Sequence, residues 1–85
     1  MGRARRTQPR KLAKKLHKIR VDLLGLSQSE MARELGLTVH YAAVSNFELG
    51  TREPGLEVVL KYARLTGIPM EVLVDDNLDL PKDLS

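Results

Sequence analysis

A chain of 85 residues with 42% apolar residues and no cysteine has room for one small core, and it excludes a disulfide framework or a thiolate metal site. The net charge of +3 is unevenly distributed, since residues 1–20 carry nine bases and no acid, whereas the remaining residues carry five bases and eleven acids. This polarity favours a polyanionic partner, with nucleic acid first, an anionic membrane surface second and a plain solubilising arm as the remaining alternative.

The first predicted segment is a basic flexible arm, because residues 1–9 are polar, carry arginines and end in a proline. A helix is expected from Pro9 to Leu24, since proline suits a first helical turn and apolar residues then recur at steps of four, three and four. Gly25 is the expected end of this helix. The apolar stripe consists of Leu12, Leu16, Ile19 and Leu23.

A capping box predicts the start of a second helix. The Ser27 side chain can accept a hydrogen bond from the backbone N–H three residues later, and the Glu30 side chain can reach back to the backbone of Ser27. Gly36 is the expected end of this short helix. Its buried face is expected to consist of Met31, Ala32 and Leu35.

A third helix is expected from about His40 to Leu49, with Val44 and Phe47 buried and Gly50 as its end. This helix contains no lysine or arginine, in contrast to the first twenty residues. Its polar residues are mostly short and neutral. A surface helix of this kind in a basic chain needs a functional explanation.

After a proline-containing loop over residues 51–55, a fourth helix is expected from about Leu56 to Thr66, ending at Gly67. Its apolar residues follow the i, i+3, i+4, i+7 pattern of one buried face. The residues of that face are Leu56, Val59, Leu60 and Ala63.

Pro69 is expected to open a short fifth helix over residues 70–74, with Met70 and Leu73 turned inward. The acidic end of the chain, residues 77–85, contains a further proline. This end is either a disordered tail or an apolar clip that folds back on the domain. The residues of such a clip would be Leu78 and Leu80.

These elements predict an all-α fold, a compact four- to five-helix bundle in which the second and third helices form a helix-turn-helix unit. The expected organisation is a basic arm at residues 1–9, a helical domain at residues 10–76 and an acidic C-terminal tail at residues 77–85.

Two stretches, GLSQSEMARELGL and VSNFELGTREPGLEVVLKYARLTGIPMEVL, resemble the Cro/CI-type helix-turn-helix family, also called the Xre family. The family pattern G-L-S-Q-x-x-L-A-x-x-x-G is filled here, except that Met31 stands where leucine is usual, and the pattern I/V-S-x-x-E-x-G-x-x-x-P follows it. The resemblance covers about residues 10–76. It implies a lambda-repressor-like DNA-binding domain.

In the family that this chain resembles, the third helix enters the major groove and its outward residues contact base edges. The base contacts that this implies are Tyr41, Ala42, Ser45 and Asn46. Asn46 suits bidentate pairing with adenine, and the Ala42 methyl suits contact with a thymine methyl. For Tyr41, packing on the domain itself remains an alternative.

The resemblance also places contacts to DNA phosphates at the start of the second helix and in the loop after the third. Backbone N–H groups and the helix dipole at a helix N-terminus attract an anion, which suits Gln28. The expected phosphate contacts are Gln28, His40, Thr51, Arg52 and Arg10. His40 is alternatively a helix cap only. Further cations come from Arg3, Arg5, Arg6, Lys11, Lys14 and Lys15.

Glu48 matches a family glutamate that pairs with an arginine of the first helix, for which Arg20 is the candidate. Together with the capping residue Ser27 and the turn residue Gly36, this pair is expected to be structural.

Two spacings depart from the family pattern. Gly36 and Glu48 are twelve residues apart, two more than usual, so the intervening turn is expected to be enlarged. Arg20 lies five residues before the glycine that ends the first helix, one more than usual, which requires a bulge or a longer loop near residues 23–24. The extra residues of the enlarged turn are expected to be Thr38 and Val39.

We therefore expect a sequence-specific double-stranded DNA-binding transcriptional regulator, a repressor and homodimer, that works in the cytoplasm in association with the nucleoid. The alternative is a protein-interaction module or antitoxin of the same fold whose main partner is another protein. The dimer surface is expected on the fifth helix and the tail, unless these residues are ordinary core. They are Met70, Val72, Leu73, Val74 and Leu78.

Enzyme activity is not expected, because the sequence contains no nucleophile motif, phosphate-binding loop or metal-ligand cluster. No cofactor, metal or membrane partner is expected either, since the apolar runs are far shorter than the ~18 residues of a membrane span.

Overall fold

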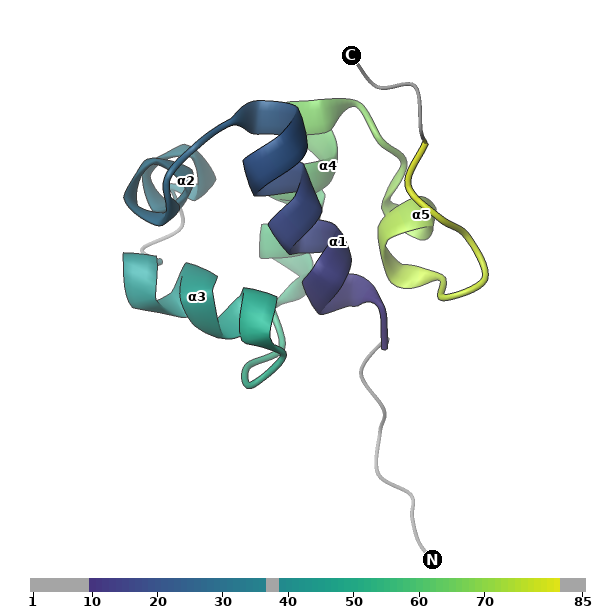
Figure 1. Cartoon of the computed structure of the whole chain (residues 1–85), viewed down its shortest axis with the longest axis horizontal. Coiled ribbons are helices and arrows are strands. Elements are labelled where there is room, and N and C mark those ends of the chain that lie inside the picture. The colour runs from purple at the N-terminus through teal and green to yellow at the C-terminus, as the bar shows by residue number, and fades with distance from the viewer. Residues whose placement is uncertain (1–9, 37–38, 82–85) are drawn as a thin grey trace, which may run out of the picture.

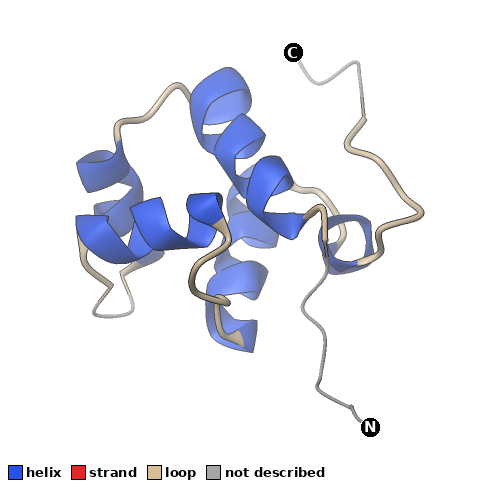
Figure 2. Ribbon diagram, turned by 60° about the horizontal axis from the view of Figure 1, so that its bottom comes forward, coloured by secondary structure: helices blue, strands red, loops and turns tan. Residues whose placement is uncertain are grey.

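The structure is a computed structural model that describes residues 10–36 and 39–81, and in this part of the chain the secondary structure consists of helices joined by loops, with no strand (Figures 1 and 2). Figure 1 shows α1 across the middle, with α2 and α3 on one side and α5 on the other. The predicted all-α bundle is therefore confirmed. In chain order the described elements are α1 (Leu12–Lys18), η1 (Ile19–Leu24), α2 (Gln28–Leu35), α3 (Tyr41–Leu49), α4 (Leu56–Thr66) and α5 (Met70–Val74).

The helix expected from Pro9 to Leu24 changes its hydrogen-bond pattern halfway. Its second half, η1, is a π-helix, and the N–H of Gly25 donates to the carbonyl of Arg20, five residues earlier. A π-helical turn accommodates one more residue than an α-helical turn. The extra residue noticed before the terminal glycine is therefore absorbed within the helix. Gly25 ends it in the left-handed conformation with φ 64°.

The start of α2 has the capping box that the sequence predicts. The backbone N–H of Glu30 donates to Ser27 Oγ at 3.0 Å, and the backbone N–H of Ser27 donates to Glu30 Oε1 at 2.8 Å. Gly36 ends α2 in the left-handed conformation. The enlarged turn that follows was assigned in part to Thr38, which lies outside the described residues, as does the basic arm at residues 1–9.

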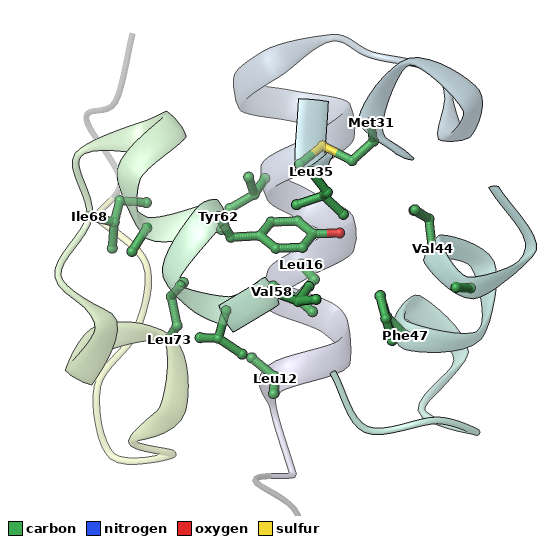
Figure 3. Packing of buried hydrophobic residues seen from close by; sticks show 14 residues of the cluster. Leu12, Leu16, Met31, Leu35, Val44, Phe47, Val58, Tyr62, Ile68 and Leu73 are labelled. Atoms are coloured by element: carbon green, nitrogen blue, oxygen red, sulfur yellow. The ribbon is translucent and has the colours of Figure 1, made fainter. Parts of the chain in front are cut away.

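The core is built from every described helix (Figure 3). Leu12, Leu16 and Ile19 form the buried stripe of α1 and η1, as expected from their spacing. The tyrosine ring of α4 lies among them at the centre of the cluster (Figure 3). The remaining buried apolar residues are Met31, Leu35, Ala43, Val44, Phe47, Val58, Val59, Ala63, Ile68 and Leu73.

The buried face predicted for α4 was wrong in part. Leu56 is 76% exposed, whereas Tyr62 is fully buried and Val58 is 7% exposed. Val59 and Ala63 are buried as predicted, so the observed stripe is rotated from the predicted one by about a quarter of a turn. Tyrosine has a large apolar body behind its hydroxyl, and the packing of α4 against η1 and α5 favours burying this ring over the leucine at the open end of the helix. The Tyr62 hydroxyl has no hydrogen-bond partner among the described residues.

Lys15 and Asp76 join the start of the chain to its end. Lys15 is only 5% exposed, and its ammonium group donates to the carbonyl oxygens of Val72, Asp75 and Leu78 at 2.6, 3.0 and 2.7 Å. These carbonyls lie in and after the last turn of α5, so the lysine acts as its C-terminal cap. The phosphate contact suggested for Lys15 was therefore wrong, because its three donors are already used inside the protein.

Asp76 makes the reciprocal connection. Its carboxylate accepts from the backbone N–H groups of Arg10 and Lys11 at 2.9 and 3.0 Å, so it caps the start of α1. The hydrogen bonds from Lys11 and then Arg10 hold the pKa of Asp76 below its ordinary value. The two ends of the described chain are thus bound together by polar contacts in both directions.

The segment after α5 packs back on the domain up to the end of the described residues. Leu80 is partly buried against the core, and Leu78 is 36% exposed. The sequence left open a disordered tail or an apolar clip for this segment, and Leu80 packs against the domain as the clip requires. Leu73 is fully buried, so its assignment to a dimer surface was wrong and it belongs to the core.

Substitution of Lys15 by alanine tests the cap on α5. We expect Lys15→Ala to lower the free energy of unfolding by about 1–3 kcal/mol, because three partly buried carbonyl groups lose their donor. Urea denaturation followed by circular dichroism measures this change. The matched control is Lys18→Ala, on an exposed lysine 3.9 Å from Asp22, which should change stability by less than about 0.5 kcal/mol. Equal effects of the two variants would contradict a capping role.

Candidate functional site

Helix α3 has one buried face and one open face. Ala43, Val44 and Phe47 are at most 5% exposed and anchor the helix in the core. On the other side the four residues predicted to contact bases point away from the core. Tyr41 and Ala42 are exposed, and Ser45 and Asn46 are half-buried. The structure therefore brings the four residues together on one outward surface.

At the N-terminal end of α3, His40 is the helix cap. Its Nδ1 accepts the backbone N–H of Ala42 at 3.3 Å, and its ring lies 4.4 Å from the ring of Tyr41. Tyr41 is 53% exposed, which excludes the alternative that it packs inside the domain. The two aromatic rings thus project from the start of α3 as a pair.

At the C-terminal end of α3, the following loop folds back on Asn46. The Thr51 hydroxyl donates to Asn46 Oδ1 at 3.2 Å, and the backbone N–H groups of Thr51 and Arg52 point at the Asn46 carbonyl at 3.1 and 3.3 Å. The Arg52 guanidinium lies 5.7 Å from the centre of the Phe47 ring, within the range of a cation–π contact. The loop therefore orients the amide of Asn46 and holds the guanidinium of Arg52 over the ring of Phe47.

The expected pair between Arg20 and Glu48 is present. Arg20 Nε donates to Glu48 Oε2 at 2.7 Å, and a second guanidinium nitrogen donates to Oε1 at 3.0 Å. The third guanidinium nitrogen donates to the carbonyl of Leu26 at 2.8 Å, and the Arg20 and Glu48 side chains are 11% and 5% exposed. A bidentate pair of this kind fixes both partners in one plane. It ties η1 to α3 and to the loop before α2.

His17 is a third member of this cluster, and the sequence analysis missed it. Its Nδ1 lies 3.0 Å from Glu48 Oε1. The signal was available, because His17 precedes Arg20 by three residues and therefore shares its helix face. Burial raises the pKa of Glu48, but hydrogen bonds from Arg20 and then His17 outweigh burial, and the pKa of this carboxyl lies below its ordinary value.

A surface pocket of about 340 Å³ lies beside this cluster, where α1, the first turn of α2 and α3 meet. It brings together Gln28, which was predicted to contact a phosphate, and Ser45, which was predicted to contact a base. The remaining lining residues are Lys14, His17, Glu48 and Leu49.

The other cations of α1 differ in how far they are neutralised. Lys11 lies 3.6 Å from Asp79, and Lys18 lies 3.9 Å from Asp22. Lys14 is exposed and has no ion pair or hydrogen bond with any of the described residues. Arg10 is exposed at the start of α1. The positive charge free to meet an anion therefore concentrates near Lys14 and Arg10.

The part of the chain that the structure describes contains no helix long and apolar enough to cross a membrane. A protein-family model described as helix-turn-helix matches residues 16–73, which is more than half of the chain. The match includes α2, α3 and the Arg20–Glu48 pair. No curated protein and no solved structure matches the chain.

The Arg20–Glu48 pair makes stability depend on pH in a defined direction. Because the pKa of Glu48 is lower in the folded than in the unfolded state, its contribution is present above the unfolded value and is lost as pH falls through the folded value. We expect unfolding free energy to decline below about pH 4 and Glu48→Gln to show a smaller decline. At neutral pH this variant should lose about 1–3 kcal/mol, since Arg20 keeps no ionised partner.

Urea denaturation between about pH 3 and pH 8 measures both effects. The matched control is Glu34→Gln, on an exposed position of α2, which should retain the acid decline of the unmodified chain. If Glu48→Gln declined as steeply as the unmodified chain, the pair would not be the source of the pH dependence.

Proposed function

The chain belongs to the Cro/CI-type helix-turn-helix family, whose members are DNA-binding regulatory domains, and on that premise we propose that it is a sequence-specific regulator of transcription that binds double-stranded DNA as a repressor. The observation that carries this proposal is the neutral outward face of α3, held on a buried opposite face. A base-reading helix does not need positive charge, because discrimination comes from base edges and affinity comes mainly from phosphates.

In this proposal α3 lies in the major groove with its outward residues at base edges. Asn46 pairs with adenine through its amide, and the hydroxyl of Thr51 holds that amide in place. Ser45 and Ala42 lie on the same side, where their small side chains allow close approach of the helix to the groove. Tyr41 adds an exposed aromatic ring at the N-terminal end of α3.

Phosphate contacts flank the reading helix on both sides. Gln28 lies at the first turn of α2, where unpaired N–H groups attract an anion, and it lines the same pocket as Ser45. Arg52 lies beyond the C-terminal end of α3, and His40 lies at its N-terminal end. The hydroxyl and the backbone N–H of Thr51 already donate to Asn46, so Thr51 is kept as the support of Asn46 and not as a phosphate contact. Arg10 extends the basic surface along α1. These positions suit the two backbones that border one major groove.

We propose a homodimer, because one short helix reads too few base pairs and two half-sites one helical turn apart multiply specificity. The exposed residues Val74 and Leu78 remain candidates for the dimer surface, and Met70 and Val72 are partly buried beside them. We propose that this repressor works in the cytoplasm, in association with the nucleoid.

A second candidate function is an interaction module or antitoxin of the same fold. Two leucines at the ends of the loop after α3 favour it, since Leu49 is 70% and Leu56 is 76% exposed. Exposed apolar residues of this size are typical of protein contacts when they gather in one patch. An antitoxin that represses its own synthesis combines both candidates.

The salt dependence of binding separates the two candidates. We expect random duplex DNA to bind at low salt and the affinity to fall at least about 100-fold between about 50 and 200 mM salt, because several phosphates are neutralised. Fluorescence anisotropy with a labelled duplex measures this slope. Affinity that does not change with salt, or no binding at low salt, would favour the interaction module.

A pair of variants tests the division between base and phosphate contacts. After selection of a binding site from random duplexes, we expect Asn46→Ala to lose about 1–3 kcal/mol on the selected site only, with relaxed preference at one base pair. Thr51→Val should relax preference at the same base pair, because it removes the hydroxyl that orients the amide. Arg52→Ala should instead weaken all duplexes alike and reduce the salt slope by about one.

Competition titrations with selected and scrambled duplexes measure the two behaviours. Identical profiles for Asn46→Ala and Arg52→Ala would show that the assignment of roles is wrong.

A further inference from the structure

We propose that His17 contacts a phosphate of the DNA backbone in its protonated form, within a notch that it forms with Lys14 and Gln28, so that DNA binding takes up a proton. This inference rests on the proposed function and extends it to a residue that neither the family pattern nor the sequence analysis assigns. The notch is the pocket of about 340 Å³ between α1, α2 and α3.

The His17 ring is oriented by the carboxylate of Glu48. Its Nδ1 lies 3.0 Å from an oxygen of Glu48, whose side chain is 5% exposed, whereas the His17 side chain is 57% exposed. The two ring nitrogens lie on opposite edges of a rigid imidazole. With Nδ1 turned toward the buried carboxylate, Nε2 lies on the outward edge of the ring. The carboxylate is itself held by two hydrogen bonds from Arg20, so the ring has a fixed support.

The position of the proton on the His17 ring decides whether the ring can contact a phosphate. Since Nδ1 faces an ionised carboxylate, it must donate, and the neutral ring then has an acceptor at Nε2. An acceptor repels a phosphate oxygen, whereas the protonated ring presents an N–H donor there. Contact with a phosphate therefore requires the imidazolium. Histidine is the side chain type whose ordinary charge change falls between pH 5 and 8, which sets the pH range of the test.

The groups around His17 set the charge balance of the notch. Glu48 on α3 favours the imidazolium, but Arg20 already neutralises this carboxylate through a bidentate pair. Lys14 on α1 opposes it, and α2 contributes the neutral Gln28 to the notch. In the free protein the notch thus carries surplus positive charge. A phosphodiester supplies the missing negative charge, which stabilises the second proton on the ring.

The lining of the notch identifies the anion as the DNA backbone. The notch contains Ser45 of the reading helix as well as Gln28, so an anion bound there lies directly beside the groove that α3 enters. Lys14 has no partner among the described residues and lines the same notch. His40 provides an internal contrast, because its Nδ1 accepts a backbone N–H and its Nε2 can donate without extra protonation.

The test compares the unmodified chain with His17→Gln and with His40→Gln as the matched control. Binding to one duplex is measured by anisotropy at about pH 6 and about pH 8 at constant ionic strength. For the unmodified chain and His40→Gln we expect affinity to fall about threefold to tenfold over this range, within the limit of about 100-fold that uptake of one full proton would set over two pH units. For His17→Gln, whose amide can still donate to Glu48, we expect no change with pH.

The pH dependence of binding distinguishes the role of His17 from the proposed function. An equal pH dependence in His17→Gln and the unmodified chain, or none in the unmodified chain although it binds DNA, would overturn the role of His17 and leave the proposed function standing. No duplex binding at low salt and either pH would overturn the proposed function itself. Thermal denaturation at both pH values shows that the variants are folded.

A competition experiment separates the DNA backbone from free phosphate as the occupant. Inorganic phosphate should displace the duplex no better than chloride at equal ionic strength. Selective displacement by phosphate that is lost in His17→Gln would assign the notch to a free anion and overturn the backbone contact. Lys14→Gln should reduce the salt slope by about one, because one cation leaves the interface. An unchanged slope would exclude Lys14 from the contact.

Discussion

The bidentate pair between Arg20 and Glu48 is the constraint on which the rest of the structure depends. It joins η1 to α3 through two short hydrogen bonds in a nearly closed environment. Because a paired guanidinium and carboxylate must lie in one plane, the pair sets the angle of α3 as well as its distance from η1. The π-helical turn absorbs the extra residue between Arg20 and Gly25, and Arg20 still meets its partner Glu48. Geometry, more than added stability, is the benefit of such a pair.

The same pair also explains how a carboxylate can lie beside a surface proposed to meet DNA. Glu48 would repel phosphates if it were free, but two hydrogen bonds from Arg20 neutralise it and the fold buries it. The same carboxylate also accepts a hydrogen bond from Nδ1 of His17, at the edge of the notch. One buried acid thus orients α3 and one proposed backbone contact together. Phosphate contacts and base contacts are proposed for different side chains, but both depend on the position of the Glu48 carboxylate.

Charge alone does not show which cations meet a partner. Lys15 lies within the most basic part of the sequence, yet its ammonium group is buried against the carbonyls after α5. The carboxylate of Asp76 accepts hydrogen bonds from the backbone at the start of α1, so part of the acidic end stabilises the fold. The domain is small and buries a limited apolar surface, so these polar contacts between its two ends add stability that the small core alone provides only in part. The cost is one cation fewer on the surface.

The sequence by itself determined the helices, their stops and the helix-turn-helix pattern. These follow from local rules, since a capping box, a left-handed glycine and a stripe of apolar residues act within one or two turns. The outward position of Asn46 and the partner of Glu48 were also predictable, the first from the stripe and the second from the family pattern. The place of His17 beside Glu48 could also have been inferred, from its three-residue spacing to Arg20. Only the tertiary structure decided that Lys15 is buried and that Tyr62 replaces Leu56 in the core. Each of these depends on the angle between helices distant in sequence, and no local pattern encodes that angle.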